Sequence, residues 1–197
     1  MTGPQPLHEA AKVAVRDQLL TARRRRPLAE VGEAARAIAE HLLAAPEVRR
    51  AATVAAYVSV GSEPGTTGLL DLLLEAGKRV ILPVLMADND LDWASYRGPG
   101  SLAPARRGLL EPLGPTLGVD AVATADVVLV PGLAVAPDGL RIGRGGGSYD
   151  RALARVPVGT FTCVLLYDDE VLPAVPAEPH DRRVSAAATP SGLRRLG

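Results

Sequence analysis

The stretch IGRGGGSYDRALAR, residues 142–155, concentrates the chemistry of this chain. Its first part, GRGGG at 143–147, runs directly into a predicted helix. Glycines in such density lower the stability of the folded state, because each loses more backbone freedom on folding than any other residue. A loop that carries this cost usually exposes backbone amides, and amides at a helix N-terminus bind anions with the support of the helix dipole. We therefore predict a phosphate site, with Arg141 and Arg144 adding positive charge.

The spacing of these glycines fits neither of two common phosphate-binding motifs. A Walker A loop requires Gly-Lys-Ser/Thr, and no lysine follows the glycines. The dinucleotide fingerprint G-x-G-x-x-G is nearly matched by Gly143, Gly145 and Ser148, but the preceding strand does not run directly into the loop. The glycines alone therefore leave a second interpretation equally open, in which they only permit a tight turn.

Two acidic residues could complete a phosphate site. Asp150 lies in the first turn of the predicted helix, where a carboxylate interacts favourably with the helix dipole. A carboxylate beside bound phosphates is also a usual Mg²⁺ ligand, and Asp181 in the polar segment EPHDRR could be the second one. The position of Asp150 alone does not decide between a helix-start residue and a metal ligand.

The helix predicted at 8–26 carries the two basic residues that are best spaced to act together. Lys12 and Arg16 share one face at i, i+4, and Lys12 is one of only two lysines among 22 basic residues. Such pairs usually belong to a solvated helix face. On another face of the same helix we expect an apolar stripe formed by Ala11, Val15, Leu19 and Leu20.

The elements that must position these residues alternate between helices and strands. Helices are expected at 8–26, 28–44, 66–76 and 148–155, and strands at 53–60, 79–83, 92–96, 126–132, 161–167 and 184–189, with 119–124 against the core. The alternation predicts an α/β fold with a mostly parallel sheet covered on both faces. Ligands of such sheets bind beyond the carboxyl ends of the strands, and the glycine loop follows the buried strand at 126–132.

Composition limits the class of protein. The 197 residues suit one domain spanning 1–197. Basic and acidic residues both number 22, so no overall charge draws the chain to nucleic acid or to a membrane. The single cysteine, Cys163, excludes an internal disulfide. Residues 1–7 contain no apolar signal-peptide core, and no run approaches eighteen apolar residues, so we expect a cytoplasmic protein. We also expect a monomer with small-molecule partners.

The stretch LVPGLAVAPDGLRIGRGGGSYDRAL resembles the 5-formyltetrahydrofolate cyclo-ligase family, also called methenyltetrahydrofolate synthetases. Further motifs of the family follow in order along nearly the whole chain: K-x-x-x-R at Lys12 and Arg16, an arginine-rich segment at 23–26, S-x-x-x-E ending at Glu63, G-K-x-V-x-L-P at 77–83, G-x-x-E-P at 108–112 and E-P-H-D at 178–181. The resemblance implies a three-layer, Rossmann-like α/β sandwich related to the sugar-phosphate isomerase and CoA-transferase scaffold.

The resemblance also implies an activity, the ATP- and Mg²⁺-dependent conversion of 5-formyltetrahydrofolate to 5,10-methenyltetrahydrofolate with release of ADP and phosphate, through an N5 iminium phosphate. The implied catalytic residues are Lys12 and Arg144. The implied ATP contacts are Lys12, Arg16, Arg141, Ile142, Gly143, Arg144, Gly145, Gly146, Gly147, Ser148 and Tyr149. The implied substrate contacts are Tyr57, Val58, Glu63, Trp93, Arg144, Gly145, Gly146, Gly147 and Ser148. The implied Mg²⁺ ligands are Asp150 and Asp181.

The chain departs from the family pattern at several positions. Ser148 stands where an aromatic residue is common, and Gly65 replaces an acidic residue. Phe161 is the only phenylalanine, so stacking on the pterin would fall to Tyr57, Trp93, Tyr96 or Tyr149. Two other functions stay open: an isomerase or transferase on a similar scaffold, which needs no ATP hydrolysis, and a folate-binding protein without activity.

Overall fold

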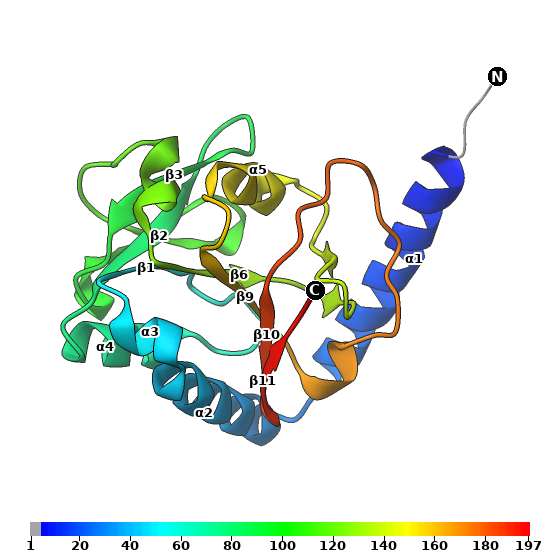
Figure 1. Cartoon of the computed structure of the whole chain (residues 1–197), viewed down its shortest axis with the longest axis horizontal. Coiled ribbons are helices and arrows are strands. Elements are labelled where there is room, and N and C mark those ends of the chain that lie inside the picture. The colour runs from blue at the N-terminus through cyan, green and yellow to red at the C-terminus, as the bar shows by residue number, and fades with distance from the viewer. Residues whose placement is uncertain (1–4) are drawn as a thin grey trace.

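A seven-stranded mixed sheet runs through the centre of the protein (Figure 1). The computed structural model describes residues 5–197. The segment 1–7, in which we expect no signal peptide, therefore lies partly outside the described residues. In spatial order the strands are β11 (Gly192–Arg195), β10 (Ala186–Thr189), β9 (Phe161–Leu165), β6 (Val127–Pro131), β1 (Thr53–Ala55), β2 (Arg79–Leu85) and β3 (Leu91–Ser95). The five central strands are parallel and the two edge strands antiparallel. The predicted, mostly parallel α/β sheet is confirmed.

Helices cover both faces of this sheet. One face is covered by α2 (Leu28–Ala44), α3 (Pro46–Arg50) and α4 (Thr67–Glu75), and the other by α5 (Ser148–Arg155) and the 3-10 helix η3 (Val119–Thr124). The bounds of α2 and α5 are those predicted. After α2 ends, Pro46 begins α3, because proline is well tolerated in the first turn of a helix.

Short elements complete the fold. The 3-10 helices are η1 (Pro99–Ser101), η2 (Arg106–Gly108) and η4 (Asp168–Glu170), and two small hairpins pair β4 (Leu102–Pro104) with β5 (Leu110–Pro112) and β7 (Ala134–Val135) with β8 (Arg141–Ile142). The β7–β8 hairpin brings Arg141 back to the end of β6, where its Nη1 donates to the Pro131 carbonyl at 3.3 Å. The β4–β5 and β7–β8 hairpins, α3 and β11 lie in segments for which the sequence predicted no such element.

Two hydrophobic clusters lie on the two faces of the sheet. Along β6, Val127 and Leu129 belong to the cluster under α2–α4, while Val128 and Val130 belong to the cluster under α5 and η3. Alternate residues of a strand point to opposite faces, so a strand buried on both sides must be apolar throughout. This requirement explains the uninterrupted apolar run of β6.

Helix α1 (Gln5–Arg24) buries basic side chains more deeply than the predicted apolar stripe. Lys12 and Arg23 are buried, Ala11 is exposed, and Val15, Leu19 and Leu20 are only partly buried. The helix lies to one side of the sheet in Figure 1, next to the orange segment that follows β9. That segment supplies Glu170, Glu178 and Asp181, and pairing with these carboxylates makes the burial of basic side chains favourable.

The predicted strand at 53–60 is too long, because β1 ends at Ala55. Its continuation, residues 56–60, leaves the sheet beyond the carboxyl end of β1. Along the chain the parallel strands run β1, β2, β6, β9, β10, whereas in the sheet β2 and β6 lie on opposite sides of β1. The strand order therefore reverses between β1 and β6, and the crevice at such a reversal is the usual ligand position in open α/β sheets.

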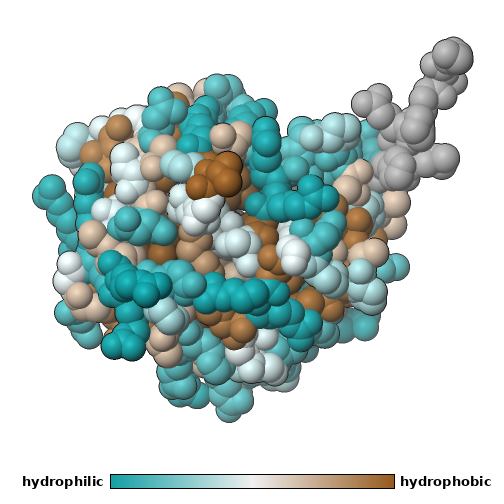
Figure 2. All heavy atoms as spheres, in the orientation of Figure 1, coloured by the Kyte–Doolittle hydropathy of each residue, from teal (hydrophilic) through white to brown (hydrophobic). Residues whose placement is uncertain are grey.

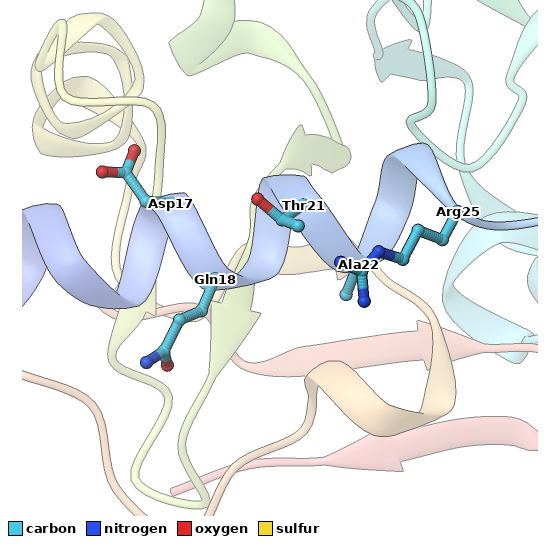
Figure 3. Close-up of a pocket in the computed structure, with 5 residues that line it drawn as sticks. All are labelled: Asp17, Gln18, Thr21, Ala22 and Arg25. Atoms are coloured by element: carbon cyan, nitrogen blue, oxygen red, sulfur yellow. The ribbon is translucent and has the colours of Figure 1, made fainter.

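The outer surface carries no extended apolar region in the view of Figure 2, where brown residues lie in separate patches among teal ones. Among the described residues, no helix has both the length and the apolar character needed to cross a membrane. Figure 3 shows a shallow, open surface depression of about 370 Å³, which is lined by Asp17, Gln18, Thr21, Ala22 and Arg25. All five belong to α1 and its end, so this depression is distinct from the crevice at β1 and β6.

Candidate active site

Lys12, in the N-terminal half of α1, lies at the centre of a charge cluster. Its Nζ donates to Glu178 Oε2 at 2.6 Å and to Asp181 Oδ1 and Oδ2 at 2.9 and 2.7 Å. The Lys12 side chain is 4% exposed and that of Asp181 is 7% exposed. The hydrogen bond from Lys12 lowers the pKa of Glu178 below its usual value. Lys12 is therefore a buried, paired ammonium and does not belong to a solvated helix face.

Arg16, one turn further along α1, reaches the glycine loop. Its Nε donates to the Gly143 carbonyl at 2.9 Å. Lys12 and Arg16 thus bring the basic face of α1 against residues that are more than a hundred positions away in the chain. Positive charge and the backbone of the glycine loop meet here at the carboxyl side of the sheet.

The backbone of the glycine loop explains two of its glycines directly. Gly145 has φ +97° and Gly147 has φ +67°, a region that residues with a Cβ rarely adopt. Gly147 is also the N-terminal cap of α5, so Ser148 and Tyr149 form the first turn of that helix. The amides of this turn have no partner within the helix, which makes them available to an anion.

Arg141 and Asp150 form a pair beneath the loop. Arg141 Nη2 lies 3.1 Å from Asp150 Oδ1, which also accepts a hydrogen bond from the Arg182 amide at 3.0 Å. Burial lowers the pKa of Arg141, although the charge of Asp150 opposes this effect. Ile142 is buried as well, so its backbone is the part that could meet a ligand. Asp150 is both a helix-start residue and the partner of a buried guanidinium.

Glu63 and Arg144 connect the segment after β1 with the glycine loop. Arg144 Nε and Nη2 lie 3.2 and 3.1 Å from Glu63 Oε1, while Glu63 Oε2 accepts the Val60 amide at 2.8 Å. The Glu63 side chain is 8% exposed and that of Arg144 is 52% exposed. The carboxylate is therefore fixed in place, whereas the guanidinium reaches it from the surface.

The aromatic residues predicted to contact a substrate occupy different places. Tyr57 and Tyr149 lie edge to face with ring centroids 6.5 Å apart, and burial raises the pKa of both phenols. The Tyr57 hydroxyl is buried without a hydrogen-bond partner among the described residues. Val58, next to Tyr57, is nearly buried. Tyr57 and Tyr149 connect the segment after β1 with the start of α5.

Trp93 and Tyr96 do not lie with this aromatic pair. Trp93 has no exposed surface and packs in the cluster under η3, because alternation along β3 turns it to that face. Its burial argues against the predicted substrate contact. Tyr96 donates from its hydroxyl to Asp71 Oδ1 of α4 at 2.7 Å.

The carboxylates of this region suit a hard cation such as Mg²⁺, which prefers oxygen ligands. Asp150 and Asp181 both act electrostatically on Arg141, and Oδ2 of Asp150 has no hydrogen-bond partner in the described part of the chain. One carboxylate was not predicted from the sequence. Glu178 lies with His180 and Asp181 in a group whose potential ligand atoms are within 4.8 Å of one another. Its place in the EPHD motif beside Asp181 was the available signal.

The sequence also did not predict the burial of Arg23. A run of arginines such as 23–26 is by itself typical of a solvated charge segment, but Arg23 is 1% exposed and pairs with Glu170. Its neighbours Arg24 and Arg25 are exposed. His180 is exposed as well.

Comparison with known proteins yields one consistent family. Residues 8–190 match the sequence model described as the 5-formyltetrahydrofolate cyclo-ligase family. The chain is 49% identical over 145 residues to the 5-formyltetrahydrofolate cyclo-ligase of Mycolicibacterium smegmatis, covering 70% of this chain and 73% of that protein. It is 33% identical over 170 residues to the Escherichia coli K12 protein of the same name, covering 82% and 89%.

Solved structures agree with this grouping. The NMR structure of Aquifex aeolicus 5,10-methenyltetrahydrofolate synthetase superposes with a TM-score of 0.81 at 27% identity, covering 94% of this chain and 92% of that chain. A 5,10-methenyltetrahydrofolate synthetase from Mycoplasma pneumoniae superposes with a TM-score of 0.72 at 19% identity, covering 91% and 98%. The second similarity supports the fold alone.

Proposed function

The chain belongs to the 5-formyltetrahydrofolate cyclo-ligase family of enzymes, and we propose that it converts 5-formyltetrahydrofolate to 5,10-methenyltetrahydrofolate with ATP and Mg²⁺. The observation that carries the ATP requirement is the contact between Arg16 and Gly143, which holds the basic face of α1 against the glycine loop. Two basic side chains, those of Lys12 and Arg16, beside the unpaired amides of the first turn of α5 suit a triphosphate. The whole chain acts as one domain on two small molecules.

The proposed reaction overcomes two chemical obstacles, a weakly electrophilic formamide carbon and a poor oxide leaving group. The formyl oxygen attacks the γ-phosphorus, ADP leaves, and an N5 iminium phosphate forms. N10 then attacks the formyl carbon and loses its proton, and inorganic phosphate leaves as the ring closes. The protein mainly positions the two reactants and neutralises charge.

Lys12, Arg16 and Arg144 neutralise the phosphates in this proposal, and residues 141–149 surround them. Glu63 hydrogen-bonds the pterin, with Tyr57 and Tyr149 as the nearby aromatic surfaces. The exposed Arg144 has to leave Glu63 when the pterin binds, which frees its guanidinium for the phosphates. The fixed position of Glu63 and the surface position of Arg144 support this exchange.

Asp150 and Asp181 would hold Mg²⁺, which would neutralise charge on the transferred phosphate. The fit rests on the chemistry of the donors. Asp150 has a carboxylate oxygen without a partner among the described residues, and Asp181 groups with Glu178 and His180 as potential oxygen and nitrogen ligands. Asp150 is not part of that group, and the two aspartates are linked by their common electrostatic effect on Arg141. Neither nucleic acid nor membrane takes part in the proposed reaction, and the protein acts as a cytoplasmic monomer.

A direct test follows the absorbance of the methenyl product. We expect product only when 5-formyltetrahydrofolate, ATP and Mg²⁺ are all present. Equal rates without ATP would contradict the proposed reaction and favour an enzyme that needs no phosphoryl transfer. Folate binding without turnover would instead indicate a binding protein, the alternative to which the departure at Ser148 points.

Replacing Asp150 with asparagine tests its role as a metal ligand. We expect the Mg²⁺ concentration for half-maximal rate to rise about tenfold, because a neutral amide is a much weaker ligand than a carboxylate. We also expect a lower melting temperature, because Arg141 loses its carboxylate partner. Rates across a Mg²⁺ titration, with thermal melts, separate the two effects.

The control is Asp120→Asn, which neutralises an exposed carboxylate of η3. It should change neither the Mg²⁺ dependence nor the rate. If the melting temperature of Asp150→Asn falls while its Mg²⁺ dependence is unchanged, Asp150 is only the ion-pair partner of Arg141 and not a metal ligand.

A further inference from the structure

Helix α1 is held against the body of the protein mainly by polar contacts. None of its residues 9–24 belongs to either hydrophobic cluster. Three basic side chains on its inner face make the long-range contacts: Lys12 with the carboxylates at 178 and 181, Arg16 with Gly143, and Arg23 with Glu170. The contacts of Lys12 and Arg16 lie where we propose that the phosphates bind, so a bound nucleotide would alter them. Of the three contacts, the one made by Arg23 would stay the same whether or not a nucleotide is bound.

The contact of Arg23 is buried and bidentate. Its Nε lies 2.6 Å from Glu170 Oε1, and its Nη2 lies 2.8 Å from Glu170 Oε2 and 2.7 Å from the Gly132 carbonyl. The side chains of Arg23 and Glu170 are 0% and 2% exposed. Gly132 directly follows β6, so this pair joins the C-terminal part of α1 to the carboxyl end of a central strand. A planar guanidinium held by two carboxylate oxygens has little freedom to rotate.

The same anchor reaches the segment that carries Glu63. Glu170 Oε2 accepts the Tyr167 amide at 2.9 Å, and the Tyr167 hydroxyl donates to the Ser62 carbonyl at 3.1 Å. The guanidinium of Arg26 lies over the Tyr167 ring at 4.0 Å. Together with the contacts of Arg16 and Arg144, these bonds form a closed ring of contacts. The ring runs from α1 to the glycine loop, then to the segment that contains Ser62 and Glu63, then to Tyr167, and through Glu170 back to α1.

We propose that the Arg23–Glu170 pair is the anchor that sets the position of α1, so that Arg23 is a positioning residue for Lys12 and Arg16. The inference rests on the proposed ATP site. Lys12 and Arg16 lie 11 and 7 residues before Arg23, which corresponds to about 16 and 10 Å along a helix. Over this distance a small tilt at the anchor displaces both side chains by about an ångström, enough to cost up to a hundredfold in rate.

The test uses Arg23→Lys and Glu170→Gln in the full chain, with calorimetric titration of MgATP in the absence of folate. Lysine keeps the charge but cannot form the bidentate contact, and glutamine keeps the shape and an acceptor for the Tyr167 amide. We expect the Kd for MgATP to rise about tenfold in both variants. In steady-state assays the KM for ATP should rise by a similar factor, and the KM for 5-formyltetrahydrofolate by less than threefold.

The matched controls are Arg195→Lys and Glu47→Gln, the same changes in an exposed arginine–glutamate pair that joins α3 to β11. They should leave the Kd for MgATP within twofold of the wild-type value. A purely structural role would lower the melting temperature of Arg23→Lys and Glu170→Gln while the Kd stayed within twofold, and this result would overturn the inference. Failure of the wild-type protein to bind MgATP would overturn the proposed function itself.

Discussion

Substitution of Gly145 by alanine is expected to lower kcat/KM about a hundredfold while the sheet stays folded. Two structural reasons act together. The φ of +97° at Gly145 is strained for any residue with a side chain, at a cost of roughly 1–2 kcal/mol. A Cβ at this position would also lie 3.3 Å from Cζ and Nη1 of Arg16, so the guanidinium would have to shift by a few tenths of an ångström, which would disturb its hydrogen bond to the Gly143 carbonyl.

The matched control for Gly145→Ala is Gly159→Ala. Gly159 has a similar φ of +90°, lies between α5 and β9, and has open space around its Cα. Both variants should lose similar stability in thermal melts, because the backbone strain is similar. Only Gly145→Ala should lose turnover, measured as methenyl product formed per enzyme. Equal activity of the two variants would show that the close approach of Arg16 to the loop has no role in catalysis.

Gly146 and Gly147, the two loop glycines that follow Gly145, have fewer constraints on a side chain. Gly146 does not have a positive φ, and a Cβ there would meet only Ser148 Oγ at an ordinary 3.5 Å. Gly147 has φ +67° but open space for a Cβ. In this structure, backbone strain and a close side-chain neighbour therefore coincide at Gly145, so this residue should be the most sensitive of the three.

Lys12→Met is expected to have the second large effect, a loss of roughly a hundredfold in kcat/KM with the KM for ATP rising more than that for folate. The ammonium would no longer be available to the phosphates. The same change leaves Glu178 and the buried Asp181 without their cation, so stability should fall by about 1–3 kcal/mol at neutral pH. Initial rates and chemical unfolding curves measure the two effects separately.

The stability loss in Lys12→Met should depend on pH in a defined direction. The pKa of Glu178 is lowered in the folded protein by its hydrogen bond from Lys12. A lowered carboxyl pKa stabilises the fold above the unfolded value of about 4.3, and the contribution disappears as the carboxylate becomes protonated at lower pH. The difference between wild type and variant should therefore be largest near pH 7 and shrink below about pH 4.

Lys78→Met is the natural control, because Lys78 is the only other lysine of the chain. Its Nζ donates to the carbonyls of Arg49 and Ala51 at the end of α3. Its removal should cost about 1 kcal/mol and leave both KM values unchanged. A shift only in the folate KM of Lys12→Met would contradict the proposed contact of Lys12 with ATP.

Much of the fold follows from local patterns in the sequence. The apolar run of β6, the periodicity of α2 and the change from glycines to a helix at Ser148 each fix an element within a few residues. These signals are local, because the apolar pattern within one strand or helix reports which of its own faces is buried. The alternation of strands and helices then limits the sheet to a mostly parallel one, with the glycine loop beyond its carboxyl edge.

Which charged side chains are buried depends on contacts between distant segments of the chain. The Lys12–Asp181, Arg23–Glu170 and Arg144–Glu63 pairs join residues 169, 147 and 81 positions apart. Periodicity in a helix reports which residues share a face, but it does not reveal whether carboxylates from distant segments will meet that face. For this reason the apolar stripe predicted for α1 is only partly correct, because Val15, Leu19 and Leu20 are half-buried but Ala11 is exposed and Lys12 and Arg23 are buried. A basic face can be buried when the fold supplies opposite charges, and that supply depends on contacts that no local pattern encodes.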